Sequence, residues 1–208
     1  MRLVLQRVVS ASVIVEGKTI SEIGKGLLCL VGINEKDDLA DGGLISSKIL
    51  TTRLWEDDNG KAWSKNVMEI GGEVLLVSNF TLYGGLKKKK PDYHSSMAPD
   101  PARKLFEEFV NYVKCEYNPD KVKEGEFQAY MTVNMAGDGP ITLVVDSEEY
   151  DNATGEIRKK LAKKMECEVK HKMRLEANRQ KQLAEKEESP VQPLSETPLE
   201  TPSEEIKE

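Results

Sequence analysis

Two nearly continuous apolar runs constrain the fold of this chain most strongly. Residues 27–33 read LLCLVGI, and residues 73–82, EVLLVSNFTL, begin with a second run of the same kind. A strand without alternating polar positions is covered on both faces, as in a barrel wall or the middle layer of a domain. The two runs are therefore expected to form buried strands of one core.

Shorter patterns predict a strand pair before the first run. Residues 2–9 alternate apolar and polar side chains, and the segments 11–15 and 19–23 flank Glu16-Gly17-Lys18. Alternation is typical of half-buried strands, and a short polar linker containing glycine is typical of a hairpin. We expect two strands joined by a tight turn.

Two helices are predicted from apolar positions at helical spacing. Asp37 or Asp38 is suited to cap a helix over the following residues, although Gly42-Gly43 predicts that it starts late or kinks. Residues 99–118 place their apolar side chains on one face and Lys and Glu on the other. This second helix is expected to pack against the sheet.

Residues 127–147, FQAYMTVNMAGDGPITLVVDS, are predicted to form two strands interrupted by a rigid turn at residues 136–140. Gly139 can adopt backbone angles denied to other residues, and Pro140 fixes its own φ and has no N–H. The turn is either an ordinary surface hairpin or a loop that holds two carbonyl acceptors in fixed positions. The local sequence leaves both interpretations open.

Composition predicts one domain of about 150 residues followed by a polar extension, because the chain has 208 residues, 38% of them hydrophobic, and a formal net charge of −6. We place the compact domain at residues 1–147. Residues 148–188 are rich in Lys and Glu and favour an exposed or partly formed helix. Residues 189–208 are rich in Pro, Ser and Glu and are expected to be disordered.

Several functional classes are disfavoured. No apolar run of about 18 residues and no signal-peptide pattern are present, which predicts a soluble cytoplasmic protein without membrane contact. The three cysteines lack metal-ligand spacing and are read as reduced structural thiols. With two histidines a His-rich metal site is excluded, and a Ser-His-Asp arrangement would have to use His94. Neither a metal nor a cofactor is predicted.

Two polar segments are candidate sites. Ser78, Asn79, Phe80 and Thr81 place polar groups where the second apolar run ends. They indicate either a site or a bulge at a strand edge. The tetrad Lys87, Lys88, Lys89 and Lys90 is either a solvated loop or a contact for a phosphate backbone.

A family resemblance connects these segments. Gln6-Arg7-Val8, Ser78-Asn79-Phe80-Thr81-Leu82, Lys90-Pro91-Asp92-Tyr93-His94, residues 127–131 and Gly139-Pro140-Ile141-Thr142 follow one another in this order. The order and spacing resemble those of the D-aminoacyl-tRNA deacylases, formerly D-tyrosyl-tRNA deacylases. The resemblance covers roughly residues 1–147 and leaves the extension outside.

The resemblance implies a homodimeric mixed α/β fold, with antiparallel-rich sheets in a barrel-like core flanked by helices. It also implies hydrolysis of the ester between a D-amino acid, or glycine, and the terminal adenosine of tRNA. In such proteins a cis Gly-Pro pair, matched by Gly139 and Pro140, projects carbonyls into the partner's pocket and excludes L side chains. Arg7 matches the arginine that supports this loop, and Ala102, Phe127 and Met131 match the pocket wall.

Three residues depart from the family pattern. Asn79 stands where glutamine is usual, Gly137 stands where asparagine precedes the Gly-Pro pair by two residues, and Gln128 replaces a small residue. Asn79 keeps the amide but shortens its reach by about 1.5 Å, one C–C bond length. An altered rate or substrate range is expected from these changes.

Ester hydrolysis needs an activated water and a stabilised oxyanion, and the sequence offers no convincing base. By resemblance, the 2′-hydroxyl of the terminal adenosine assists proton transfer while backbone amides near Phe80 and Thr81 bind the oxyanion. The alternative mechanism uses Thr81 as a covalent nucleophile activated by His94. Two alternative functions are a tRNA-binding module with weakened turnover and an interaction protein that holds nucleic acid through the lysines of its extension.

Overall fold

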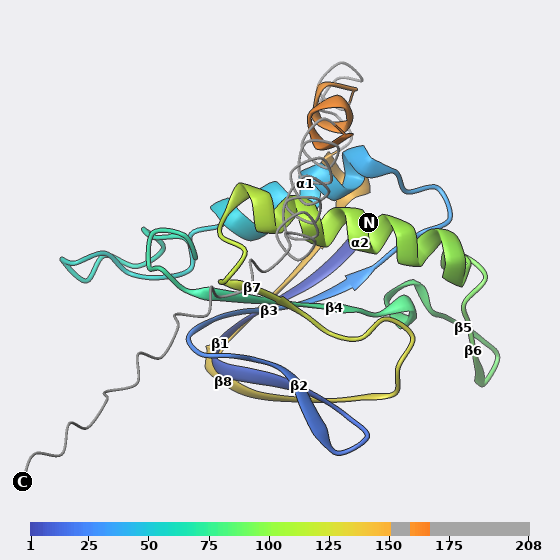
Figure 1. The fold of residues 1–208 in the computed structure, drawn as a ribbon, viewed down its shortest axis with the longest axis horizontal. Helices are drawn as coiled ribbons and strands as arrows, with labels where there is room; N and C mark the ends of the chain where they lie inside the picture. The colour runs from blue at the N-terminus through green and yellow to red at the C-terminus, as the bar shows by residue number, and fades with distance from the viewer. Residues whose placement is uncertain (151–158, 167–208) are drawn as a thin grey trace, which may run out of the picture. The chain divides into compact units, whose positions relative to one another are not determined.

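The computed structural model describes residues 1–150 and 159–166 (Figure 1). In chain order the elements are β1 (Arg2–Val15), β2 (Lys18–Ile23), β3 (Gly26–Gly32), α1 (Leu39–Thr51), β4 (Glu73–Ser78), the 3-10 helix η1 (Phe80–Tyr83), β5 (Gly85–Lys87), β6 (Lys90–Asp92), α2 (Pro99–Glu116), β7 (Val122–Glu124), β8 (Met131–Asp146) and the 3-10 helix η2 (Ser147–Tyr150). Residues 159–166 are also helical.

Strand β1 organises the sheet because it has neighbours on both edges along most of its length. Within the described residues one six-stranded sheet has the order β2-β1-β3-β4-β7, and β8 also pairs with β1. The pairs of β1 are antiparallel, whereas β3 with β4 and β4 with β7 are parallel. Helices α1 and α2 are the crossovers of these parallel pairs, and Figure 1 shows both helices on the same side of the sheet. The predicted mixed fold, with a barrel-like sheet and flanking helices, is confirmed.

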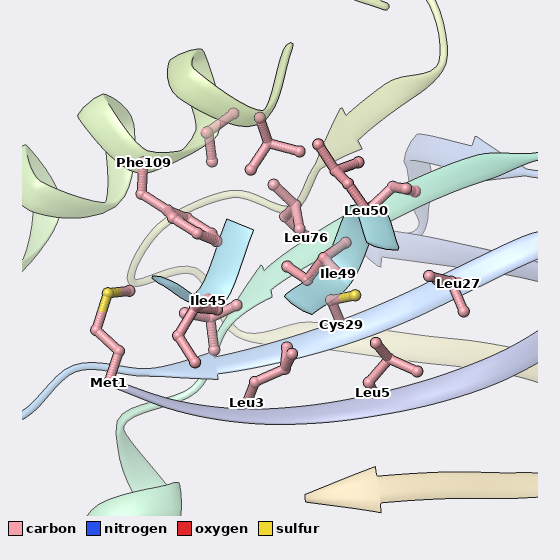
Figure 2. Close-up of a cluster of buried hydrophobic side chains, with 14 of the residues drawn as sticks. Met1, Leu3, Leu5, Leu27, Cys29, Ile45, Ile49, Leu50, Leu76 and Phe109 are labelled. Carbon is pink, nitrogen blue, oxygen red and sulfur yellow. The ribbon is translucent and has the colours of Figure 1, made fainter. Parts of the chain in front are cut away.

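The two apolar runs form the buried strands that the sequence predicts. On β3, Leu27 and Cys29 belong to the cluster under the helices, while Leu28 belongs to a second cluster on the opposite face of the sheet. Figure 2 shows Phe109 of α2 and Ile45 of α1 in the first cluster. Burial raises the pKa of the Cys29 thiol, which therefore remains protonated.

The β1–β2 hairpin is also confirmed. Glu16 and Gly17 occupy the turn with φ values of 50° and 78°. Two successive left-handed residues give a turn whose twist matches that of paired strands.

Helix α1 differs from the prediction at its glycines. It begins at Leu39, directly after the N-cap Asp38, and continues through Gly42 and Gly43. Asp38 accepts hydrogen bonds from the amides of Ala40 and Asp41 at 2.8 and 3.2 Å. The late start or kink is therefore wrong: the cap fixes the first turn, and both glycines are buried against side chains from distant parts of the chain.

Residues 127–147 also differ from the prediction. A single strand, β8, begins at Met131 and continues through the expected turn at residues 136–140. The pairing with β1 changes register between Gln6–Thr142 and Val8–Gly137, so residues 138–141 lie opposite Arg7 alone. The long edge of β1 holds the segment in the sheet, and the extra residues form a bulge instead of a hairpin turn.

Part of the extension packs on the domain. Met165 is fully buried, and the Lys164 ammonium pairs with the Glu116 carboxylate at 3.0 Å. The sparse apolar pattern predicted an exposed helix, so this contact is not evident from the sequence. The predictions for residues 167–188 and for the disordered segment 189–208 lie outside the described residues. Among the helices described, none is both long and apolar enough to span a bilayer.

Candidate active site

The main pocket opens where the three parallel strands end. It has a volume of about 570 Å³ and lies beside residues that follow β3, β4 and β7, together with the start of α2. Ligand sites in sheets of this kind characteristically lie at the carboxyl ends of parallel strands. The lining residues are Val31, Ile33, Ser78, Asn79, Phe80, Tyr93, Ser96, Met97, Ala98, Pro99, Ala102, Phe127, Gln128, Ala129 and Met131.

The segment from Ser78 to Thr81 turns away from β4 through a side-chain cap. The backbone N–H of Asn79 donates to the carbonyl of Val31 at 2.8 Å. The side-chain Oδ1 of Asn79 accepts from the backbone N–H of Thr81 at 3.1 Å. The Thr81 hydroxyl donates to the same Oδ1. The backbone N–H and the hydroxyl of Thr81 therefore both stabilise the turn. Thr81 does not line the pocket.

Phe80 presents the backbone amide that remains available. Within the described residues no group accepts a hydrogen bond from this amide, whereas the Phe80 carbonyl accepts one from the Ser96 hydroxyl at 2.9 Å. The Phe80 ring is 58% exposed and meets Tyr93 edge-on, with centroids 4.9 Å apart. An unused N–H donor thus belongs to a residue of the pocket wall, which Ser78 also lines.

His94 does not contact Thr81. Its Nδ1 lies 3.2 Å from Oδ2 of Asp92, its Nε2 lies 3.2 Å from the Ser95 hydroxyl, and its side chain is 79% exposed. Among the described residues that line the pocket, none carries an imidazole, carboxylate or ammonium group. The geometry provides no base for a threonine nucleophile.

Arg7 holds the bulge of β8. Its Nε lies 3.0 Å from Oδ2 of Asp138, its Nη2 donates to Oδ1 of Asp138 at 3.2 Å, and its Nη1 donates to the Leu54 carbonyl. Gly139 follows with φ +98°, and a Cβ there would lie 3.1 Å from Nη2 of Arg7. The left-handed backbone favours glycine at this position, and a larger residue would also displace the Arg7 guanidinium slightly.

The predicted cis bond is wrong. No cis peptide bond occurs among the described residues, so Gly139 and Pro140 are joined in trans. Both residues lie within β8, where the positive φ of Gly139 accommodates the bulge. Both are exposed, and neither lines the pocket of its own chain.

The three predicted wall residues, Ala102, Phe127 and Met131, all line the pocket, and Ala102 is a buried residue of α2. Sequence reasoning missed Ile33, Ser96 and Met97, which lie in loops whose sequence carries no periodic signal. It also missed β7, because three residues are too few to show a strand period.

The lysine tetrad lies on a small hairpin beside this site. Lys87 ends β5 and Lys90 begins β6, and all four lysines are exposed. Within the described residues none of the four forms an ion pair. The hairpin leads directly to Tyr93 at the pocket wall.

Comparison with known proteins places this architecture in a family. The family model for D-Tyr-tRNA(Tyr) deacylase matches residues 4–146, more than half of the chain. The chain belongs to this deacylase family. The match includes every residue that lines the pocket and ends before the extension.

Deacylase relatives are similar over nearly the same region. D-aminoacyl-tRNA deacylase 1 of Leishmania major is 46% identical over 150 residues, which are 72% of this chain and 99% of the relative. D-aminoacyl-tRNA deacylase 1 of Homo sapiens is 41% identical over 156 residues, 75% of each chain. A solved structure described as c-Myc DNA Unwinding Element Binding Protein has a TM-score of 0.68 and 42% identity, covering 70% of this chain and 98% of that one.

Proposed function

We propose that this protein hydrolyses the ester bond of D-aminoacyl-tRNA and releases the free amino acid and tRNA. The observation that carries the proposal is the strand-end segment from Ser78 to Phe80, which opens into a pocket of about 570 Å³ in a chain of the deacylase family. That volume is within the range of about 300–1,000 Å³ that is usual for small-molecule sites. Glycyl-tRNA is a second expected substrate, and a role in translation proofreading implies a cytoplasmic location.

The chemistry we propose relies on the Phe80 amide. When water attacks the ester carbonyl, negative charge develops on the carbonyl oxygen, and a fixed N–H donor stabilises it. Ser78 supplies a hydroxyl that orients the ester. Because the described pocket residues provide no base, the 2′-hydroxyl of the terminal adenosine carries the proton to the leaving 3′-oxygen. Asn79 and Thr81 hold the turn that aims the amide.

We further propose that the working unit is a symmetric homodimer. Gly139 and Pro140 are exposed and lie outside their own pocket, as is expected of groups that serve the pocket of a second copy. Several apolar side chains of β1 and β8 are also exposed: Val9, Val133, Met135, Leu143 and Val144. Exposed apolar side chains on two paired strands favour an interface with a second copy of the chain.

We also propose that the hairpin carrying residues 87–90 contacts the phosphates of the tRNA. Its four cations are exposed and carry no ion pair with a described residue, so counterion release can drive binding to a phosphate backbone.

The decisive experiment compares tRNAs charged with the D and L forms of one amino acid, together with glycyl-tRNA, in single-turnover hydrolysis. We expect cleavage of the D-aminoacyl and glycyl substrates and retention of the L-aminoacyl ester. Similar rates for the D and L forms would refute the proofreading assignment. Binding of D-aminoacyl-tRNA without turnover would favour the binding-module alternative that Asn79 and Gly137 motivate.

A further inference from the structure

Arg103 occupies the rim of the pocket in an unusual setting. Its guanidinium carbon lies 4.8 Å from the centroid of the Phe127 ring, and its Nη2 donates to Oε1 of Gln128 at 2.7 Å. Phe127 and Gln128 both line the pocket. Arg103 itself is exposed, so its guanidinium contacts two wall residues from the solvent side, at the mouth of the pocket.

The charge of Arg103 is not neutralised within the described part of the chain. No carboxylate there forms an ion pair with it, although Glu107 lies one helical turn further along α2. One of the five guanidinium N–H groups serves Gln128, and the others remain available. A cation with unused donors at the mouth of an uncharged pocket is suited to an anionic part of the ligand.

The surroundings of Arg103 fix its position. The Phe127 ring packs on Phe106, with centroids 5.9 Å apart, and Phe106 in turn packs on the fully buried Phe109 at 6.3 Å. Gln128 has φ +67°, a left-handed conformation that is uncommon for residues other than glycine. Strain of this type is retained where the surroundings over-determine a residue, and here the Arg103–Gln128 bond contributes to that restraint.

We propose that Arg103 binds the phosphate that joins the last two nucleotides at the 3′ end of the tRNA. The inference rests on the proposed function: with the ester beside Phe80 and the terminal ribose within the pocket, the 5′-phosphate of the terminal nucleotide leaves through the mouth. The planar guanidinium matches two phosphate oxygens. Arg103 contacts Phe127 and the lysine hairpin leads to Tyr93, two residues that line the pocket, and we place the 3′ strand between these two cationic groups.

The test compares Arg103→Ala with wild type on two substrates that carry the same D-amino acid. One is D-aminoacyl-tRNA, and the other is D-aminoacyl-adenosine, which keeps the ester, ribose and base but has no phosphate. We expect KM for the tRNA to rise about tenfold with little change in kcat, since an exposed charged hydrogen bond lies at the low end of its range. KM for the adenosine ester should stay within twofold.

Two controls isolate the contact. Lys104→Ala removes the neighbouring exposed cation of α2 and should leave both KM values unchanged. Arg103→Lys should give an intermediate KM for the tRNA because it keeps the charge and loses the planar fork. The slope of log KM against log salt should also fall by about 0.7 in Arg103→Ala, the value for one phosphate on a single strand.

Two results would overturn the inference. One is an equal rise of KM for both substrates, which would mean that Arg103 acts on the adenosine or the pocket wall. The other is no rise for either. Failure of the wild-type protein to cleave either D-aminoacyl ester would instead refute the proposed function, so the two failures are distinguishable.

Discussion

Gly43→Ala tests how the extension is joined to the domain. A Cβ at residue 43 would lie 3.1 Å from Sδ of Met165 and 3.4 Å from Cβ of Leu161. All three of its nearest neighbours thus belong to the helix at residues 159–166. In a chain that ends at Tyr150, the same Cβ would lose these neighbours.

The expected effect of Gly43→Ala on stability differs between the two chains. In the chain that ends at Tyr150, Gly43→Ala should stabilise the domain by about 1 kcal/mol, the difference in helix propensity between glycine and alanine. In the full chain, overpacking against Met165 costs roughly 1–3 kcal/mol and cancels or reverses that gain. The coupling between the substitution and the extension is therefore about 1–3 kcal/mol. Since about 1 kcal/mol corresponds to roughly 2–4 °C for a domain of this size, the shifts are measurable by calorimetry.

Gly42→Ala is the matched control. Its Cβ would lie 3.3 Å from Cε of Met165, a looser approach than at Gly43, and its contacts with the Phe109 ring at 3.5 Å and Sδ of Met1 at 3.7 Å are of ordinary van der Waals length and remain when the extension is removed. We expect a smaller difference between the two chains for this substitution. An equal effect of Gly43→Ala in both chains would show that the helix does not pack on α1 in solution.

Three further predictions follow from single contacts. Thr81→Ala should slow hydrolysis modestly, about tenfold or less, because it loosens the turn without removing the Phe80 amide; a trapped acyl-Thr81 species would reverse this mechanism. Replacing the four lysines of residues 87–90 with glutamine should raise KM for tRNA and flatten its salt dependence while sparing D-aminoacyl-adenosine; an unchanged salt slope would remove the hairpin from the interface. Tyr83→Phe should leave the urea midpoint at pH 7 equal or higher, because the Tyr83 hydroxyl is buried without a partner in the described structure. Burial raises the pKa of Tyr83, so the folded chain keeps this hydroxyl neutral at pH values where the unfolded chain ionises it. The free energy of unfolding is therefore unaffected by this group below about pH 10, where unfolded tyrosine ionises, and declines as the pH rises further. Tyr83→Phe should therefore lose less stability than wild type between pH 9 and 11, and an identical decline would contradict the assignment.

The core strands could be predicted because a strand buried on both faces has a recognisable local sequence, a nearly continuous apolar run. The runs that became β3 and β4 contain no alternation, and both faces of each strand are indeed covered. The glycines of α1 were misjudged because the side chain that fills the space beside them, Met165, is more than a hundred positions away. Local propensity favours a kink there, and tertiary packing overrides it.

The candidate site was predictable only in part. Ser78, Asn79 and Phe80 stand out because polar groups follow a buried strand directly, and they line the pocket. Gly139 and Pro140 were read as a turn because their local signal is that of a turn, whereas pairing with β1 keeps them in β8. Arg103 looks like any exposed helix residue, since its contact with Gln128 joins segments 25 residues apart.

The position of the pocket at the ends of β3, β4 and β7 has a consequence for how this enzyme family can diversify. Most residues that line the pocket lie outside the strands, although Val31, Ile33 and Ala102 line it and also belong to the buried cluster. Asn79 and Gln128, two departures from the family pattern, both line the pocket and lie outside the strands and the buried clusters. Substitutions there can change which esters are accepted while the free energy of unfolding stays nearly constant, so selection can act on specificity separately from stability.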